Sequence, residues 1–312
     1  MNAKERYLWD LNGHLIVRNA LNDEEIKAAN DAIDFCSDRI TPGQANRLSA
    51  GSTFLQSQGR PGLRGTNLLD IEKPHCEIFR RLLAHPAIMS RLKTMCGHGF
   101  RLDHGPQFIG GVKGTSGHAL HGSGAPHKPN VGYRNRHGEM HCPGVTVSWQ
   151  LAEVPEGQGG FACVPGSHKS DFDMPDGVRT VDGDMGTSIN PEAHPGDVVF
   201  FMDGAQTHGT YPWLNDHERR SILYKFASRT AVRTGVSVQF APPEIYWEEH
   251  ITEGMTSEER AVMFGPCTGH SGIVPSLEVT ADGQLVVEGG DADIAPPTPD
   301  GLPQPREATA AG

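Results

Sequence analysis

One segment in the second half of the chain constrains the fold more than any other. An unbroken apolar run, Val198 to Met202, is typical of a buried strand. His208 follows its end, and a second strand begins eleven and twelve positions later with Arg219 and Arg220. Strands in this order would bring an imidazole and a guanidinium together near the mouth of a β-barrel. An imidazole is a good ligand for divalent iron, and a guanidinium binds a carboxylate through two parallel hydrogen bonds.

The bulk composition fits a globular protein with many short strands. The 312 residues include 38 glycines and 23 prolines, which favours strands and irregular loops over a helical bundle. The net charge is -11 and no block is rich in lysine and arginine, so we expect no nucleic-acid partner. No apolar run approaches the roughly 20 residues that span a bilayer, and the N-terminus lacks the apolar region of a signal peptide. We therefore expect a cytoplasmic protein with no membrane partner.

The pattern along the chain predicts a single domain over residues 1–290. Helices that pad one face of a sheet are expected within residues 20–96. The first of them starts at Asn22, where Glu25 completes a capping box. Residues 291–312 are rich in proline, alanine and glycine and lack apolar periodicity, so they are expected to form a disordered tail.

Strands dominate the middle of the chain. A core of strands is expected over about residues 100–240, with clear alternation of apolar and polar residues from Val145 to Val154. Residues 111–142 form a long polar stretch rich in glycine and histidine, which is typical of a functional loop. A C-terminal helix is expected over about residues 244–264. The predicted fold class is mainly β with flanking helices.

Six segments between about residues 6 and 230 form a recognisable set. They are Gly13-His-Leu-Ile-Val-Arg-Asn-Ala-Leu21, Trp149-Gln-Leu151, Gly159-Gly-Phe-Ala-Cys-Val-Pro-Gly-Ser-His-Lys169, Gly196-Asp-Val-Val-Phe-Phe201, Thr207-His-Gly209 and Arg219-Arg-Ser-Ile-Leu-Tyr-Lys-Phe-Ala-Ser228. The set resembles the phytanoyl-CoA dioxygenase family of Fe(II)- and 2-oxoglutarate-dependent oxygenases. The resemblance implies a double-stranded β-helix, that is, a jelly-roll or cupin-like core. It also implies ferrous iron, 2-oxoglutarate as co-substrate, O₂, and hydroxylation of a small molecule.

The resemblance assigns roles to several residues. The distal iron ligand of the family maps onto His208, and its 2-oxoglutarate-binding arginine maps onto Arg219, with Arg220 as the neighbour that could take this role. Strand alternation adds Gln150, which faces the opposite side of its strand from Trp149 and could form a hydrogen bond with the co-substrate.

The proximal iron-binding element departs from the family pattern, which is His-x-Asp or His-x-Glu. His121-Gly-Ser123 lies at the expected position, 87 residues before His208, but has no carboxylate. His137-Gly-Glu139 has the expected letters but lies only 12 residues before Trp149. We favour His121 as the ligand. The third ligand is then Glu139 folded back, another acid, water or a halide.

Three alternatives stay open at this point. A metal without a carboxylate ligand has room for chloride, so a 2-oxoglutarate-dependent halogenase is one alternative. A non-catalytic jelly-roll binding protein is the second. The third is adventitious zinc binding by a histidine-rich stretch, whose members are His118, His121, His127, His137 and His141. Two aspartates that flank the apolar run, Asp197 and Asp203, are expected to be turn residues rather than ligands. The oligomeric state is open.

Overall fold

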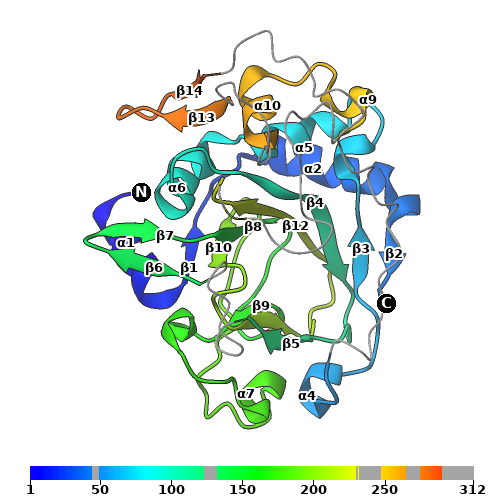
Figure 1. Cartoon of the computed structure of the whole chain (residues 1–312). Coiled ribbons are helices and arrows are strands. Elements are labelled where there is room, and N and C mark those ends of the chain that lie inside the picture. Colours follow the sequence, from blue (N-terminus) through cyan, green and yellow to red (C-terminus); the bar gives the residue numbers. More distant parts are fainter. Residues whose placement is uncertain (44–48, 123–131, 230, 232–246, 265–274, 290–312) are drawn as a thin grey trace, which may run out of the picture.

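Two antiparallel sheets face each other, and helices cover the outer face of the larger one (Figure 1). The computed structural model describes residues 1–43, 49–122, 132–229, 231, 247–264 and 275–289. The larger sheet has the strand order β1-β10-β8-β12-β4-β3-β2. Its strands are β1 (His14–Val17), β2 (Thr41–Pro42), β3 (Leu63–Gly65), β4 (Arg101–Gly111), β8 (Gly144–Gln150), β10 (Val198–Met202) and β12 (Arg219–Ala227).

The smaller sheet contains three strands in the order β5-β11-β9. They are β5 (His118–His121), β9 (Gly160–Cys163) and β11 (His208–Tyr211). Two separate hairpins complete the described strands, namely β6 (Arg134–Arg136) with β7 (Glu139–His141), and β13 (Ser276–Val279) with β14 (Leu285–Glu288). The predicted class, mainly β with flanking helices, is confirmed.

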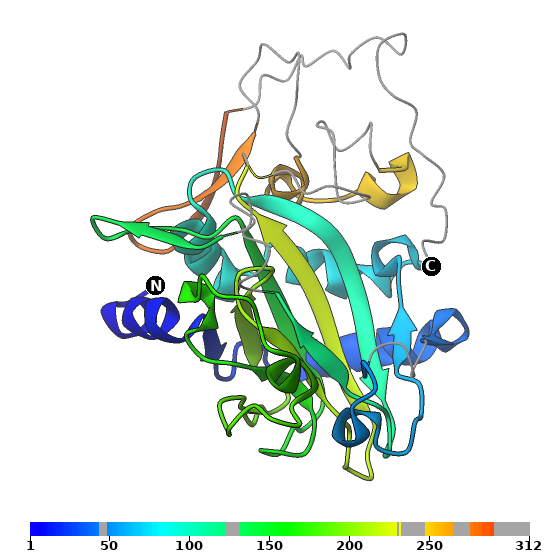
Figure 2. The ribbon, with the colours of Figure 1, turned by 60° about the horizontal axis from the view of Figure 1, so that its bottom comes forward.

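Alternation along the long strands separates a helix-facing side of the larger sheet from an inner side. On β12 the Tyr224 side chain faces the helices and its hydroxyl donates to the carbonyl oxygen of Phe79, at 2.7 Å. On β8, Trp149 also faces the helices, and its ring meets the His85 ring edge-on with centroids 5.3 Å apart. Residues of the opposite parity on β8 and β12 therefore face the smaller sheet. Figure 2 shows β4 and β12 running side by side across the molecule.

Aromatic contacts join the two sheets. Phe161 of β9 stacks on Phe201 of β10, with ring centroids 4.7 Å apart. Phe201 also belongs to a small buried apolar cluster, separate from the large core under the helices. Its buried members are Val154, Ala193, Val199, Phe201 and Trp213. The side chains of this cluster fill one part of the space between the two sheets.

Helices from both ends of the chain cover the outer face. The predicted capping box is confirmed, since the Glu25 amide donates to Asn22 Oδ1 and the Asn22 amide donates to the Glu25 carboxylate. In the described ranges the α-helices are α1 (Ala3–Asn12), α2 (Asp23–Phe35), α4 (Thr53–Gln56), α5 (Cys76–Leu83), α6 (Pro86–Cys96), α7 (Asp176–Thr180), α9 (Glu249–Thr252) and α10 (Ser257–Met263). Short 3-10 helices occur at Ser37–Arg39, Leu68–Asp70 and Ser167–Lys169.

The C-terminal part differs from the single helix expected over about residues 244–264. The structure divides the described part of this range into α9 and α10, with Gly254 between them at a φ of 76°. Such a backbone conformation interrupts a helix and favours glycine. The predicted tail, residues 291–312, lies outside the described residues. Within the described ranges, no helix is both long enough and apolar enough to cross a bilayer.

Candidate metal centre

Two histidines meet across the smaller sheet. His121 of β5 and His208 of β11 are directly paired across the antiparallel ladder, and their ring centroids lie 4.4 Å apart. Gly209 permits this close pairing, because a Cβ at this position would overlap the carbonyl oxygen of His118. The chain has 16 histidines, and His121 and His208 are the two that the sequence favours as metal ligands. The structure thus brings these two side chains together.

Backbone carbonyl groups fix the orientation of both imidazoles. Nδ1 of His121 lies 3.1 Å from the carbonyl oxygen of Ala119, and Nδ1 of His208 lies 2.8 Å from that of Gln206. A carbonyl oxygen only accepts, so these contacts place the proton of each neutral ring on Nδ1. Each Nε2 then carries a lone pair. Metal-binding histidines are commonly held in this way, through a backbone carbonyl at the other ring nitrogen.

Burial keeps these imidazoles neutral. Loss of solvent, with a smaller contribution from His121, lowers the pKa of His208 to about 3. Burial also lowers the pKa of His121. A neighbouring ring, His118, meets His121 edge-on with centroids 4.5 Å apart, and burial lowers its pKa to about 4. Neutral imidazole is the form that binds a metal.

A phenylalanine ring and an ion pair between Asp203 and Lys225 lie beside the two histidines. The Phe201 ring lies 4.7 Å from the His208 ring. Asp203 Oδ1 lies 3.8 Å from His208 Nε2, and Asp203 Oδ2 lies 3.2 Å from Lys225 Nζ. Asp203 is therefore more than the turn residue expected from the sequence, because its side chain faces the open nitrogen of His208. Asp197 does stabilise a turn, since its carboxylate accepts hydrogen bonds from the amides of Asn19 and His194.

The two arginines at the start of β12 have different surroundings. Arg220 points to α2, where its guanidinium donates to Asp34 at 2.7 Å and Asn30 at 3.2 Å. Arg219 lies on the inner side, with its Nε 3.5 Å from where a Cβ of Gly160 on β9 would be. Within the described part of the chain, this Nε is buried without a hydrogen-bond partner. Of the two arginines, Arg219 is thus the one that lies between the sheets.

The surroundings of Arg219 are positively charged. Burial, followed by repulsion from Arg64, lowers the pKa of Arg219 to about 10, which leaves the guanidinium protonated at neutral pH. Arg64 reaches this region from β3, where it pairs with Ile109 of β4, which pairs in turn with Ser221 of β12. A partly buried cation beside a second cation requires an anionic partner. A carboxylate of a ligand would meet this requirement.

Gln150 occupies the face expected for it. It is paired with Ser221 of β12, two residues from Arg219, so its side chain lies on the inner side of the larger sheet. The side chain is buried, and its amide nitrogen donates to Ser148 Oγ at 2.8 Å and to the Ser148 carbonyl oxygen at 3.1 Å. These bonds to Ser148 hold the amide in place on the inner side of the larger sheet.

Glu139 is not brought to the histidine pair. It is exposed and opposes Arg136 in the β6–β7 hairpin, whose turn residues His137 and Gly138 have φ values of 54° and 85°. A hydrogen bond from Asn135 to Asp10 ties this hairpin to α1, and Figure 1 places it beside α1, away from β5 and β9. Glu139 therefore takes no part in the site proposed below. Ser123 and His127 lie outside the described residues.

The residues present fit a ferrous ion and a dicarboxylate only in part. Two neutral imidazoles with open Nε2 atoms suit the metal, and Arg219 with its unpartnered buried Nε suits a carboxylate. Among the residues that the structure describes, however, no three histidine, cysteine, aspartate or glutamate side chains already surround one point as a metal site. The five cysteines within the described ranges are all buried.

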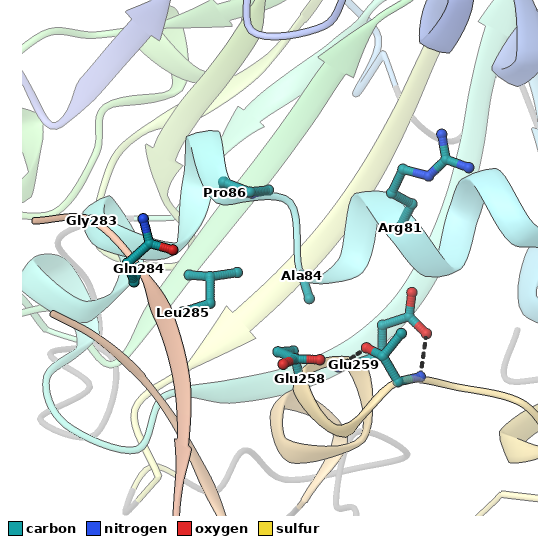
Figure 3. A pocket seen from close by; sticks show the side chains of 9 residues that line it. Arg81, Ala84, Pro86, Glu258, Glu259, Gly283, Gln284 and Leu285 are labelled. Carbon is teal, nitrogen blue, oxygen red and sulfur yellow. Dashed lines mark hydrogen bonds between the residues drawn. The ribbon is translucent and has the colours of Figure 1, made fainter.

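A hollow of about 490 Å³ lies on the helical side of the molecule (Figure 3). It is bordered by α5, α10 and the β13–β14 hairpin, so the larger sheet separates it from the histidine pair. Its polar groups serve local structure, since the Thr256 amide donates to the Glu259 carboxylate as part of the capping box of α10. Its lining residues are Arg81, Ala84, Pro86, Thr256, Glu258, Glu259, Gly283, Gln284 and Leu285.

Solved structures share the fold over most of this chain. HygX from Streptomyces hygroscopicus, with nickel and 2-oxoglutarate bound, matches with a TM-score of 0.59 and 18% identity over 75% of this chain and 90% of its own. AviO1 from Streptomyces viridochromogenes Tue57 matches with a TM-score of 0.56 and 18% identity over 75% of this chain and 98% of its own. At these identities the likeness establishes the fold. No curated protein sequence matches this chain.

The sequence itself establishes the family. The family model for phytanoyl-CoA dioxygenase matches residues 9–221, which is more than half of the chain. The predicted enzyme class and its two cofactors are thereby confirmed, and the alternative of a non-catalytic binding protein is set aside. The chain belongs to the phytanoyl-CoA dioxygenase family, as a non-haem iron enzyme that depends on 2-oxoglutarate.

Proposed function

We propose that this enzyme hydroxylates a small molecule, with His121 and His208 as iron ligands and Arg219 as the residue that binds the distal carboxylate of 2-oxoglutarate. One observation carries the assignment. The open Nε2 atoms of the two imidazoles and the unpartnered Nε of Arg219 all belong to side chains on the inner side of the two sheets. Arg220 takes no part, because Asp34 and Asn30 already bind its guanidinium.

The residues of the chain hold and orient the reactants. When bound, ferrous iron with 2-oxoglutarate and O₂ supplies the oxidation of an unreactive C–H bond. His121 and His208 offer neutral nitrogen donors whose tautomers are set by backbone carbonyls. Arg219 orients 2-oxoglutarate through a charge-assisted pair, and Gln150 is the proposed polar neighbour of the co-substrate. Phe201 excludes water beside His208.

We also infer that the two sheets form the double-stranded β-helix expected from the sequence, within a single domain over residues 1–290. The order of strands along the chain supports this. From β4 onward, β4, β8, β10 and β12 lie in the larger sheet, and β5, β9 and β11 in the smaller one. The chain therefore crosses repeatedly between two facing sheets, which is the arrangement of a jelly roll.

The structural neighbours support a small-molecule substrate. HygX has been solved with hygromycin B bound, and SnoN, an epimerase from nogalamycin biosynthesis, has been solved with nogalamycin RO. SnoK, a further neighbour, is a carbocyclase. One fold therefore accommodates several outcomes of the same oxidising chemistry. Hydroxylation is the outcome that we propose for this chain.

Halogenation is the second candidate. The position of the family acid holds Ser123, which supplies no carboxylate, and chloride is an anion that can fill a position on the metal left open by a missing acid. Under this alternative the same His121, His208 and Arg219 would act, and only the anion at the third position would differ.

Turnover of 2-oxoglutarate tests the proposal. The enzyme is supplied with Fe(II), 2-oxoglutarate and O₂, and succinate is quantified with and without chloride against a His208→Gln variant. We expect slow succinate formation even without a substrate, and only in the wild-type protein. Equal succinate in both proteins would contradict the proposal. With a substrate in hand, a chlorinated product that requires chloride would establish the halogenase.

A further inference from the structure

The missing acid of the His121-Gly-Ser123 element raises the question of which residue supplies negative charge to the metal. Asp203 lies in the right place. It directly follows β10, and its backbone amide donates to the Gly144 carbonyl oxygen at 3.0 Å, which fixes the turn that leads to His208. Its side chain is only 6% exposed and faces His208. A buried carboxylate in this position requires positively charged neighbours.

The distance between Asp203 and His208 suits a shared metal ion better than a direct bond. Asp203 Oδ1 and His208 Nε2 are 3.8 Å apart, beyond the range of a hydrogen bond. With metal–ligand bonds of roughly 2.0–2.2 Å, two donors on one ion lie about 3.0 Å apart at a right angle and about 4.2 Å apart when opposite. The observed separation falls between these limits. The Nε2 of His208 is also the ring nitrogen that the Gln206 carbonyl leaves open.

Lys225 completes the arrangement on the far side of the carboxylate. Its Nζ lies 3.2 Å from Oδ2, so one carboxylate oxygen faces an ammonium group and the other faces His208. A carboxylate held in this way can bind a metal through one oxygen while the other stays paired. Groups that hydrogen-bond to metal ligands commonly fix their orientation and affect metal affinity. Lys225 lies on the same face of β12 as Arg219, six residues away.

We propose that Asp203 is the third protein ligand of the iron and that Lys225 is the residue that positions it. The inference rests on the proposed function, since it assumes that His121 and His208 hold iron. The three side chains do not yet surround one point, because no such group exists among the described residues. Metal binding would therefore draw Asp203 Oδ1 and the two imidazoles toward one another. The iron would receive two nitrogens and one carboxylate oxygen without an acid at position 123.

Titration with Co(II), a spectroscopic stand-in for Fe(II) that tolerates air, tests the assignment. The full-length wild-type, Asp203→Asn and Asp197→Asn proteins are compared. Asp197 is a matched control, because it flanks the other end of β10, is also buried and is also paired with a cation, Arg18, at 2.7 Å. We expect Asp203→Asn to weaken Co(II) binding by about tenfold or more and to change the Co(II) absorption spectrum. Asp197→Asn should change neither.

The Co(II) absorption spectrum shows whether Asp203 binds the metal directly or only places a negative charge near it. Weaker binding with an unchanged spectrum in Asp203→Asn would mean that the carboxylate acts from a distance, which overturns the proposal. Unchanged affinity and spectrum would overturn it as well. If Asp203→Asn does not fold, Asp203→Glu replaces it, and an unchanged spectrum in that variant is the contradicting result. Lys225→Met should keep Co(II) bound with a shifted spectrum, and no shift would remove the positioning role.

Failure of this inference can be distinguished from failure of the proposed function. A wild-type protein that binds no Co(II) at all, with no change after His208→Gln, contradicts the histidine site itself. A wild-type protein whose Co(II) binding depends on His208 but not on Asp203 leaves the histidine site intact and rejects only the carboxylate ligand. In that case an exogenous anion becomes the third ligand, and added chloride should shift the wild-type spectrum.

Discussion

His121 and His208 occupy directly opposed positions on β5 and β11, and each has its Nδ1 against the carbonyl oxygen two residues before it. The same kind of contact with a nearby backbone carbonyl therefore orients both rings, although the two histidines are 87 residues apart in the chain. This arrangement leaves two neutral nitrogen donors on one side of a strand pair. Metal binding should consequently depend on both residues and on the spacing between their strands.

Replacement of either histidine should abolish the metal site while the fold is retained. For His208→Gln and His121→Gln we expect the Fe(II) affinity, measured by anaerobic calorimetric titration, to fall by more than about tenfold, the smallest loss seen when even a supporting residue is changed. His194→Gln is the control, because this half-exposed histidine contacts Glu153 and lies outside the site. An equal loss in the control would point to adventitious binding by surface histidines.

The two neighbouring arginines should respond differently to the same change. Arg219→Gln removes the guanidinium proposed to bind 2-oxoglutarate, so the KM for 2-oxoglutarate should rise about tenfold to a hundredfold, the equivalent of a charge-assisted pair worth about 1.5–3 kcal/mol. Arg220→Gln loses its contacts with Asp34 and Asn30, so it should lower the melting temperature slightly and leave this KM unchanged. Succinate formation at varied 2-oxoglutarate concentrations measures both. A larger KM effect in Arg220→Gln would reverse the assignment.

The pairing of β5 with β11 should be sensitive to a single methyl group. Gly209→Ala would push a Cβ against the His118 carbonyl oxygen, so the strands must separate, at a cost of about 1–3 kcal/mol in the free energy of unfolding. Fe(II) affinity should fall with it, because His121 moves away from His208. Gly183→Ala is the control, since its Cβ would meet only ordinary contacts and its φ is not positive. Urea unfolding and metal titration check both. Unchanged Fe(II) affinity in Gly209→Ala would show that strand spacing does not control the site.

Acid should destabilise the metal-free protein through its buried histidines. His85 accepts a hydrogen bond from the Ala87 amide at Nδ1, which caps α6, and burial lowers its pKa despite Glu25 nearby. Because the unfolded chain binds a proton near pH 6.5 and the folded ring resists it, this contribution is complete above pH 6.5. It is lost as the pH falls toward the folded pKa, by up to about 1.4 kcal/mol per pH unit. His85→Asn keeps a capping residue and should show a shallower dependence of unfolding free energy on pH between 6.5 and 5. An identical slope would rule out His85.

The sequence predicts those parts of the fold that follow from local patterns. Alternation from Val145 to Val154 predicts a strand, because one face of that strand packs against an apolar layer, and the observed strand β8 ends earlier, at Gln150. The capping box at Asn22 located the start of α2. The same pattern occurs at Asn2 with Glu5 and starts α1, so the signal for that unpredicted helix was present in the sequence.

Other features depend on how the chain folds back on itself. The sequence left Arg219 and Arg220 both open, because neighbours on a strand face opposite sides and only the contact with Asp34 shows which side faces α2. His137-Gly138-Glu139 looked like a metal motif, whereas two consecutive positive φ values make it a hairpin turn. Asp203 was expected to serve only the turn, since nothing local reveals that this turn brings its carboxylate to His208.

The central claim is that iron and 2-oxoglutarate assemble at one place, between the two histidines and Arg219. The most direct test is anaerobic addition of 2-oxoglutarate to the Fe(II)-loaded protein, followed by visible absorption. We expect a metal-to-ligand charge-transfer band in the wild-type protein, no band in His208→Gln, and in Arg219→Gln a band that requires more 2-oxoglutarate. A wild-type protein that shows no band, or a band that survives His208→Gln, would contradict the account.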